Sequence, residues 1–360
     1  MKAAVLREVG KPLEIENIEI SKPKSREVLI RTSATGVCHS DVHFVRGAYP
    51  AELPIVLGHE SAGVVEQVGE DVTYVKPGDH VITCLSVFCG YCEPCLTGHM
   101  SICENPAVKG PEASRGRLQK GEEAISQFAN LSSFAEQMLV HEHAVVKIRE
   151  DFPMDRAALI GCGVMTGVGA VFHTAAVEPG STVAVIGCGG VGLSAINGAA
   201  IAGAGKIIAI DLVGSKLNLA KQFGATDVVD ASSEDPVRAV REMTSGGVHY
   251  SFEAIGNKTA AEQCFRMIRP GGTATVIGMI PVGTNIELHG PEFLREKKIQ
   301  GSSMGSNHFR VDMPRLCDFY LDGKLHLDEM ISQRITLDQV NDAMDELEQG
   351  ELARSIIMFN

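Results

Sequence analysis

The sequence predicts an α/β protein in which a β-rich domain carries an inserted, doubly wound parallel sheet. Residues 1–160 offer short β-rich segments separated by turns that contain glycine and proline, without a regular alternation of strands and helices. From residue 164 to residue 304, short apolar strands alternate with helical segments, a pattern typical of a parallel sheet covered by helices. The length of 360 residues suits about two domains.

Six strands are expected in the alternating region. The predicted strands are Thr182–Gly187, Lys206–Asp211, Asp227–Asp230, Tyr250–Ala254, Thr273–Gly278 and Lys298–Gly301. The predicted helices between them are Val191–Gly203, Lys216–Phe223 and Lys258–Ile268. Strands that alternate with helices in this way should form one parallel, doubly wound sheet.

The flanking regions are less regular. Strands are expected at Glu27–Thr32 and Ser61–Val68, and residues 105–127, which are polar and rich in turn residues, are expected to form a long surface loop. After residue 304 the sequence predicts helices at Met313–Leu321 and Leu337–Gln349 and a last strand at Ser355–Phe359. No internal repeat interrupts this order.

Composition and charge argue against several classes of partner. The formal net charge is -13 and no lysine- or arginine-rich block occurs, so a nucleic acid backbone would be repelled. Apolar runs such as Thr182–Ile186 are far shorter than the ~18 residues that a membrane helix needs. The segment Met1–Gly10 lacks the apolar core of a signal peptide. We therefore expect a cytoplasmic protein that acts on a small molecule, without nucleic acid or membrane partners.

A glycine-rich turn follows the first strand of the alternating region. Residues 187–192 read Gly-Cys-Gly-Gly-Val-Gly and match G-x-G-x-x-G between a strand and a helix, which is the context of a dinucleotide site. Gly187 permits the sharp turn, Gly189 lets a pyrophosphate approach the backbone, and Gly192 lets helix and strand pack closely. Gly190 lies at the start of the helix, where N–H groups and the helix dipole favour phosphate.

Asp211 ends the next predicted strand, 19 residues after Gly192. A carboxylate there can accept hydrogen bonds from the adenosine ribose, and its charge would repel a 2′-phosphate. No arginine follows in Leu212, Val213 or Gly214 to counter that repulsion. The sequence therefore predicts NAD rather than NADP.

Four of the ten cysteines fall within fifteen residues, in the pattern C-x2-C-x2-C-x7-C. These are Cys89, Cys92, Cys95 and Cys103. Four thiolates suit one tetrahedral zinc ion, and because no coordination position stays open, that zinc should be structural. An iron–sulfur cluster is the competing interpretation, but in the bacterial pattern the fourth cysteine comes sooner and precedes a proline, whereas Cys103 precedes Glu104.

Three further segments carry metal-ligating and proton-transferring residue types. They are Gly36 to His43, which reads GVCHSDVH, Gly58-His59-Glu60, and Gly161 to Gly167, which reads GCGVMTG. Together with the cysteine lobe and the glycine-rich turn, they resemble the zinc-containing medium-chain alcohol dehydrogenases, and the resemblance runs from the N-terminal strand to Arg354. It implies a GroES-like catalytic domain, residues 1–163 and 305–360, and a six-stranded Rossmann domain for NAD, residues 164–304.

The resemblance also implies roles for individual residues. Cys38, His59 and Cys162 match the ligands of a catalytic zinc, and Glu60 matches a carboxylate near that metal. Asp41 matches the residue that orients the ligand histidine, a common support for a metal-bound imidazole. Ser40 and His43 match the two ends of a proton relay. The remaining matches are cofactor positions at His39, Thr166, Val191, Lys216 and Arg354, and substrate-pocket positions at Ser40, Leu85 and Ala129.

The implied reaction is the reversible oxidation of a primary or secondary alcohol with hydride transfer to NAD. Zinc acts as a Lewis acid that lowers the pKa of the alcohol. The polyol branch of the family has a glutamate where this chain has Cys162, which favours the alcohol branch. Leu85 and Ala129 are smaller than the usual residues there, which favours a bulky, aryl or cyclic alcohol. The 105–127 segment resembles the dimeric branch, so a homodimer is expected and a homotetramer is the alternative.

Two other functions stay open. A thiol-dependent formaldehyde dehydrogenase uses the same scaffold, but that branch carries an acidic and a basic residue where this chain has Tyr49 and Ala107. A non-catalytic NAD or metal sensor would not require that every catalytic position be filled, as it is here. Formaldehyde turnover that depends on an added thiol would separate the first alternative from a simple alcohol dehydrogenase.

Overall fold

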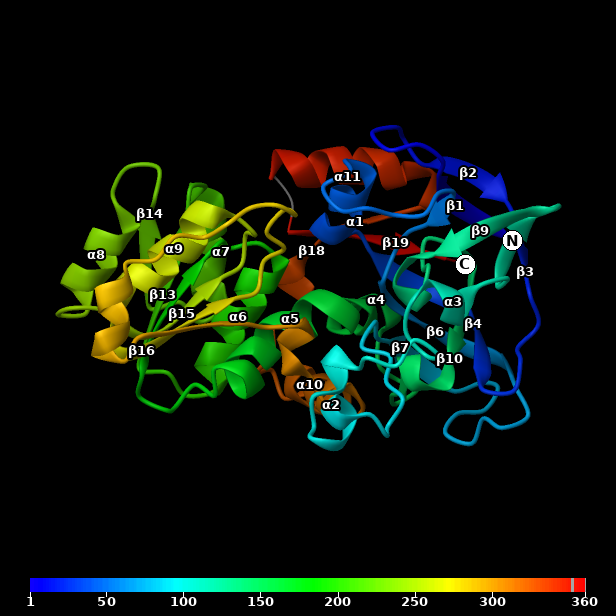
Figure 1. The fold of residues 1–360 in the computed structure, drawn as a ribbon, viewed down its shortest axis with the longest axis horizontal. Coiled ribbons are helices and arrows are strands. Elements are labelled where there is room, and N and C mark those ends of the chain that lie inside the picture. The colour runs from blue at the N-terminus through cyan, green and yellow to red at the C-terminus, as the bar shows by residue number, and fades with distance from the viewer. Residues whose placement is uncertain (351–352, 360) are drawn as a thin grey trace. The chain divides into compact units, whose positions relative to one another are not determined.

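The computed structural model describes residues 1–350 and 353–359. The chain forms two compact units (Figure 1). Unit 1 comprises Met1–Cys162, His308–Gly323 and Leu327–Asn360, and unit 2 comprises Gly163–Asn307 and Lys324–His326. The sequence placed the corresponding boundaries after residues 163 and 304.

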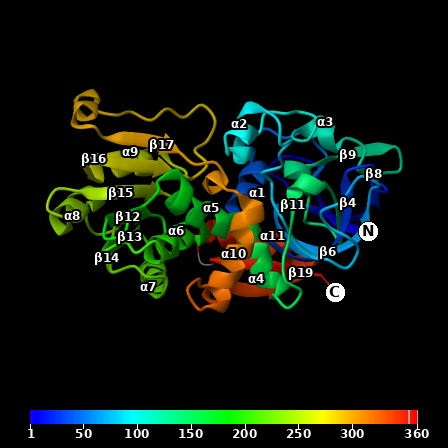
Figure 2. The same cartoon turned by 90° about the horizontal axis from the view of Figure 1, so that it is seen from below.

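Unit 2 is built on the predicted six-stranded parallel sheet. Figure 2 shows its strands in the order β14-β13-β12-β15-β16-β17, and every neighbouring pair is parallel. The strands are β12 (Thr182–Ile186), β13 (Lys206–Asp211), β14 (Asp227–Asp230), β15 (Val248–Glu253), β16 (Ile268–Val276) and β17 (Lys298–Gly301). The order reverses between β12 and β15. This is the Rossmann arrangement, and such a reversal marks the crevice where ligands bind in open α/β sheets.

Helices connect these strands. They are α6 (Gly190–Ile201), α7 (Gly214–Gln222), α8 (Pro236–Met243) and α9 (Lys258–Met267), while α5 (Met165–Gly169) precedes β12. Right-handed crossovers place α6 and α7 on one face of the sheet and α8 and α9 on the other. The sequence analysis did not predict α8, although it begins with a recognisable signal: the Asp235 carboxylate accepts hydrogen bonds from Val237 N and Arg238 N, and Pro236 occupies the first helical position.

Buried aliphatic and aromatic side chains hold the sheet of unit 2 against these helices. Ile186 and Ile210 of the sheet belong to one cluster with Val240 of α8 and Phe265 of α9. Strands buried in this way read as continuous apolar runs, which is why the parallel sheet was recognisable in the sequence.

Unit 1 contains two sheets. One has the order β2-β1-β5-β9-β8-β3, and the other has the order β11-β7-β6-β4-β19-β18 with β10 also paired to β4. Their strands are β1 (Lys2–Leu6), β2 (Glu14–Asn17), β3 (Glu19–Ile20), β4 (Glu27–Gly36), β5 (Ile55–Val56), β6 (Glu60–Val68), β7 (His80–Thr83), β8 (Leu118–Lys120), β9 (Glu123–Gln127), β10 (Gln137–His141), β11 (Val145–Lys147), β18 (Ile331–Ile335) and β19 (Arg354–Met358). These sheets make up the β-rich domain that the sequence predicted.

The helices of unit 1 are short except near the C-terminus. They are α1 (His39–Val45), α2 (Glu93–Leu96), α3 (Pro111–Ser114), α4 (Met154–Leu159), α10 (Phe309–Leu321) and α11 (Val340–Gln349). Both predicted C-terminal helices are present, and the strand predicted at Ser355–Phe359 is found one residue earlier as β19.

The prediction of a long surface loop at residues 105–127 is wrong in its second half. Residues 118–127 form the hairpin β8–β9, in which Leu118 pairs with Ile125. Both side chains are buried, at 1% and 4% exposure. Turn residues and charged residues dominate this segment, so the sequence did not reveal Leu118 and Ile125, the two apolar residues that hold the hairpin in the core.

One helical run, Met154–Thr174, is long and apolar enough to cross a membrane by length and composition. It did not stand out in the sequence because glycine and threonine interrupt its apolar residues. Within its most apolar window, 83% of the residues are buried inside the protein. Such burial is typical of the core helix of a globular protein.

Candidate metal centres and dinucleotide site

The four cysteines of the lobe converge on one point. The Sγ–Sγ distances are 3.9 Å for Cys89 and Cys95, 3.4 Å for Cys92 and Cys95, and 3.8 Å for Cys92 and Cys103. Four sulfur atoms bound tetrahedrally to zinc at about 2.3 Å would lie about 3.8 Å apart. The geometry therefore fits a single metal ion held by four thiolates.

Local backbone turns create this convergence. Gly90 adopts a positive φ of 87°, which turns the chain so that Tyr91 N and Cys92 N donate hydrogen bonds to Cys89 Sγ at 3.5 and 3.3 Å. Desolvation alone would raise the pKa of the Cys89 thiol, but these two N–H groups outweigh it and lower the pKa to about 6. Cys92 then caps α2, whose single turn brings Cys95 back to the same point.

A second cluster lies deep in unit 1. Cys38, His59 and Cys162 are all buried, and their donor atoms lie within 4.8 Å of one another. Cys162 Sγ is 3.2 Å from His59 Nε2. Within the described part of the chain, no further cysteine, histidine, aspartate or glutamate joins this group. Two thiols and one imidazole fit zinc with one coordination position open.

Three separate elements supply these donors. Cys38 is the residue that precedes α1, His59 precedes β6, and Cys162 lies in a π-helical turn, Ile160–Val164, that follows α4. Pairing of β4 with β6 aligns Gly36 with Glu60, which brings the first two donors together. A π-helical turn inside an α-helix is frequently found at functional sites.

Asp41 lies beside the His59 imidazole, the ring with which the family resemblance associates it. Its Oδ1 lies 3.2 Å from His59 Nδ1 and accepts from Gly58 N at 3.0 Å, and its Oδ2 accepts from Cys38 N at 3.2 Å. Nδ1 is thereby engaged, and Nε2 faces the thiols. Burial would lower the pKa of His59, but the Asp41 carboxylate outweighs it and raises that pKa well above its usual value.

Glu60 and Arg354 form a buried ion pair beside the thiols. Arg354 Nε lies 3.2 Å from Glu60 Oε1, and Arg354 Nη2 donates to Cys38 Sγ at 3.6 Å. A hydrogen bond with Cys162, supported by the charge of Arg354, holds the pKa of Cys38 well below its usual value. The same hydrogen bond raises the pKa of the Cys162 thiol well above its usual value. The sequence associated Arg354 with pyrophosphate and missed this contact.

Ser40 and His43 both lie on α1, three residues apart and therefore on one face of the helix. Ser40 Oγ is 3.6 Å from Cys38 Sγ. His39, the other cofactor position on this helix, is exposed. Ser40, one end of the proton relay that the family resemblance implies, thus lies beside the thiol of Cys38.

A chain of aromatic rings extends from one side of His59. Phe128 packs edge-on against His59 with ring centroids 5.5 Å apart, and Phe44 packs against Phe128 at 4.6 Å. Tyr49 lies 5.8 Å from Phe44 and 6.1 Å from His43. Isolated aromatic residues carry no motif, so only the fold could reveal this group.

The two predicted substrate-pocket residues are both partly buried in unit 1. Ala129 follows Phe128 in a 3₁₀ turn, has a positive φ of 53° and packs against the first β-sheet core. Leu85 packs against the core cluster that contains Val87 and Val145. Each therefore offers only part of its side chain to a ligand.

The glycine-rich turn lies in unit 2 at the carboxyl end of β12. Gly187 has a φ of 95°, and a Cβ at Gly192 would overlap the carbonyl oxygen of Gly187. A Cβ at Gly189 would meet nothing within 4 Å, so the backbone there is open to a ligand. Gly190 begins α6, and in the described chain no side chain caps that helix. These features fit a pyrophosphate.

Asp211 lies beside this turn, at the carboxyl end of β13. Its Oδ2 accepts from Cys188 N at 2.7 Å and its Oδ1 accepts from Val213 N at 3.1 Å. A carboxylate has about four acceptor sites, so capacity remains for ribose hydroxyls. Lys216 is half-buried in the first turn of α7, the helix that follows Asp211.

The remaining cofactor positions of unit 2 lie on two other helices. Val191 is half-buried in the first turn of α6. Thr166, in α5, is buried and its Oγ1 lies 3.3 Å from Met304 Sδ. The structure thus brings the glycine-rich turn, Asp211 and Val191 together at one edge of the sheet.

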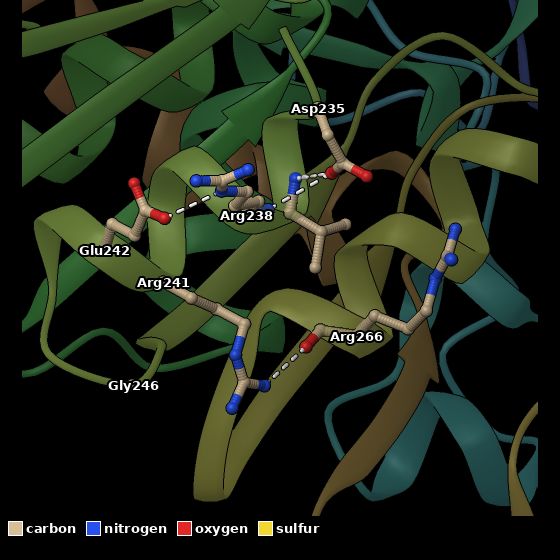
Figure 3. Close-up of a pocket in the computed structure, with 7 residues that line it drawn as sticks. Asp235, Arg238, Arg241, Glu242, Gly246 and Arg266 are labelled. Atoms are coloured by element: carbon tan, nitrogen blue, oxygen red, sulfur yellow. Dashed lines mark hydrogen bonds and ion pairs between the residues drawn. The ribbon is translucent and has the colours of Figure 1, made fainter.

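A separate hollow of about 490 Å³ lies on the surface of unit 2 (Figure 3). It is lined by Asp235, Val237, Arg238, Arg241, Glu242, Gly246 and Arg266. Its arginines already have partners: Arg238 Nε lies 2.8 Å from Glu242 Oε1, and Arg241 Nη1 donates to Arg266 O at 3.2 Å. None of the predicted site residues lines this hollow.

Known families match two long segments of the chain, and known proteins match nearly all of it. Residues 24–150 match the alcohol dehydrogenase GroES-like domain, and residues 190–321 match the zinc-binding dehydrogenase family. An alcohol dehydrogenase class-3 from Drosophila melanogaster is 40% identical, over 99% of this chain and 97% of its own. An S-(hydroxymethyl)glutathione dehydrogenase from Paracoccus denitrificans is 36% identical, over 99% of each chain.

A solved structure agrees over the same extent. The benzyl alcohol dehydrogenase from Acinetobacter calcoaceticus superposes with a TM-score of 0.94 at 34% identity, covering 100% of this chain and 99% of that one. The fold and both domains are therefore shared with these enzymes.

Proposed function

The chain belongs to the zinc-containing medium-chain alcohol dehydrogenases, and from this membership we propose that it oxidises an alcohol reversibly to an aldehyde or ketone with NAD. We propose one catalytic and one structural zinc ion per chain. The observation that carries the proposal is the buried cluster of Cys38, His59 and Cys162, whose three donors leave one position for substrate. The lobe supplies four donors and suits the structural ion.

Each group has a distinct task in this proposal. When bound, zinc polarises the alcohol oxygen and NAD accepts the hydride. Asp41 holds the His59 ring so that Nε2 faces the cluster. Ser40, beside Cys38, takes the hydroxyl proton, and His43 on the same face of α1 passes it on.

The aromatic group beside His59 favours a bulky or aryl alcohol. Phe128 contacts the His59 ring, Phe44 contacts Phe128, and Tyr49 contacts Phe44, so the three rings form one packed set that begins at His59. Rings of this kind pack well against another ring and provide apolar area for it. The benzyl alcohol dehydrogenase among the similar structures acts, by its name, on such a substrate.

A thiol-dependent formaldehyde dehydrogenase is the second candidate. The names of two relatives at 36% and 40% identity favour it. Against it, Tyr49 and Ala107 stand where the glutathione-dependent branch carries an acidic and a basic residue. Tyr49 packs against Phe44 and leaves no carboxylate at that position to recognise an ammonium group.

A substrate panel separates the two candidates. We expect benzyl and cyclic alcohols to produce NADH, measured by absorbance, with a higher kcat/KM than ethanol. Formaldehyde should not be oxidised faster when glutathione is added. Turnover of formaldehyde only with glutathione or another low-molecular-weight thiol would favour the second candidate.

Cofactor choice tests the role of Asp211. Charge-assisted hydrogen bonds to ribose hydroxyls contribute roughly 1.5–3 kcal/mol each, and a 2′-phosphate would replace them with repulsion. We therefore expect a preference for NAD over NADP on the order of 100-fold or more in kcat/KM. Asp211→Gly combined with Leu212→Arg should shift that preference towards NADP.

The hydrogen bonds from Asp211 to Cys188 N and Val213 N call for a control. Asp211→Asn keeps an oxygen that can accept a hydrogen bond from the turn but removes the negative charge. It should therefore reduce the preference for NAD over NADP while the turn keeps a hydrogen bond to residue 211. The ratio of the two kcat/KM values is the quantity to compare, because loss of turn support weakens both cofactors. If the ratio of kcat/KM for NAD to kcat/KM for NADP did not change in either variant, Asp211 would not be the residue that binds the adenosine ribose.

Further expectations concern the setting of the enzyme. All ten cysteines are free thiols, which suits the reducing cytoplasm. We propose that the partner is a small-molecule alcohol or aldehyde, with neither nucleic acid nor membrane. We also propose a homodimer, with a homotetramer as the alternative, and sedimentation analysis distinguishes them.

A further inference from the structure

Glu253 is a buried acid that the proposed reaction does not use. It is the last residue of β15 and is 0% exposed. β15 is the strand that pairs with β12 where the sheet order reverses, and Glu253 pairs there with Ile186, the residue before Gly187. Ligands of open α/β sheets bind outside the carboxyl ends of the strands at this reversal.

The Glu253 carboxylate joins two loops at this edge of the sheet. Its Oε1 accepts from Ile255 N at 2.8 Å and from Gly256 N at 2.6 Å, both in the loop after β15. Its Oε2 accepts at 3.2 Å from Gly278 N, in the loop after β16. One side chain therefore fixes the backbone of two neighbouring loops.

Among the described residues, the hydrogen-bond partners of the carboxylate are all backbone N–H groups, with no cation beside it. Burial raises the pKa of Glu253, and hydrogen bonds from those N–H groups oppose the rise. An unpaired buried carboxyl is costly unless it is fully hydrogen-bonded. An apolar residue at the end of β15 would avoid the cost of burying a carboxyl group. We therefore infer that the carboxylate is useful at this position because it fixes the geometry of the two loops.

The loop after β15 also touches the glycine-rich turn. Ala254 N donates to Ile186 O at 2.9 Å, and a Cβ at Gly187 would meet the Ile255 side chain at 2.6 Å. Ile255 itself is 50% exposed at the carboxyl edge. Asp211 marks the adenosine side of the reversal, on β13, so the loops after β15 and β16 lie on the opposite, nicotinamide side.

We propose that Glu253 is a positioning residue that holds the loops after β15 and β16 in the shape that receives the nicotinamide half of the dinucleotide. The inference rests on the proposed use of NAD. In this proposal, the Glu253 carboxylate supports the loops that receive the nicotinamide, and the Asp211 carboxylate binds the adenosine ribose.

Glu253→Gln tests the proposal, because the amide has the same size but turns one acceptor into a donor that faces N–H groups. Binding is measured by calorimetry with two probes, AMP for the adenosine half and NADH for the whole dinucleotide. We expect AMP affinity to stay within about twofold of wild type and NADH affinity to fall by about tenfold or more, with a lower kcat. Glu253→Asp keeps the charge but shortens the reach, and an intermediate NADH affinity is expected.

Ser251→Ala is the matched control. Ser251 is buried in the same strand, and its Oγ donates to Cys264 O at 2.9 Å, away from the carboxyl edge. Loss of this hydroxyl should lower the Tm, but it should change the affinities for AMP and NADH by the same factor. If Glu253→Gln lost affinity equally for AMP and NADH, or lost affinity for neither, the proposal would be overturned. If Glu253→Gln does not fold, the ratio of NADH affinity to AMP affinity in Glu253→Asp decides in the same way. Wild-type protein that binds AMP but not NADH would instead contradict the proposed function.

Discussion

The four-cysteine lobe takes all of its sulfur donors from Cys89 to Cys103, whereas the buried cluster draws on residues 38, 59 and 162. In the lobe, two of the four cysteines are partly exposed, and a glycine turn and one helical turn suffice to collect them. In the buried cluster all three donor residues are buried, and the two thiols have pKa values shifted in opposite directions by the hydrogen bond between them.

On this difference rests our proposal that the lobe serves stability and the buried cluster serves chemistry within one domain. The lobe satisfies every position of a tetrahedral ion and so favours a closed, structural site. The buried cluster leaves one position open and surrounds its donors with Asp41, Glu60 and Arg354, which fix the ring and set the charge.

Removing a donor from the buried cluster should abolish catalysis. In Cys38→Ala we expect turnover below detection, because the two remaining donors, His59 and Cys162, are too few to hold the zinc ion that binds the substrate. NADH binding, measured by fluorescence titration, should stay near wild type since the glycine-rich turn belongs to unit 2. Zinc per chain should fall from two to one.

Cys84→Ala removes another buried thiol of unit 1 that belongs to neither cluster, and serves as the control. It should keep both zinc ions and most of the activity. A Cys38→Ala enzyme with wild-type turnover would show that the open cluster is not the catalytic centre.

Removing a donor from the lobe should affect stability instead. In Cys95→Ala we expect a loss on the order of a few kcal/mol, because binding at a closed site is coupled to folding. For domains of this size each kcal/mol lowers the Tm by roughly 2–4 °C. Calorimetry gives the Tm, and the kcat of the remaining folded enzyme should change little. If the Tm held and only kcat fell, the assignment of the lobe as structural would fail.

Loosening the support of His59 should have a smaller, graded effect. Asp41→Asn keeps an oxygen for one backbone N–H but loses the charge that holds Nδ1. Replacing such a support typically costs about 10–100-fold in metal affinity or activity. Competition with a chelator measures the affinity, and lobe zinc, which Asp41 does not contact, provides the internal reference. Equal release of both ions would indicate general unfolding rather than a local role.

The elements that the sequence predicted well are those whose signal is local. The lobe spacing, the glycine-rich turn and the six apolar strands of unit 2 each occupy a short stretch, because turn chemistry and strand burial act over a few residues. The hairpin at Leu118–Gln127 was missed for the opposite reason. Its strands pair with distant partners, β3 and β5, and the core formed by those pairs outweighs a polar local sequence.

At the sites, the sequence by itself determined which donors exist, and resemblance to a family connected Cys38, His59 and Cys162. Only the tertiary structure decided that Arg354 lies against Glu60 and Cys38, some 294 residues from the former, and that Phe128 packs on His59. It also decided that Glu253 bridges two loops at the sheet reversal. A contact between residues far apart in the chain depends on strand order and burial, and neither leaves a repeat or a spacing that the sequence alone can show.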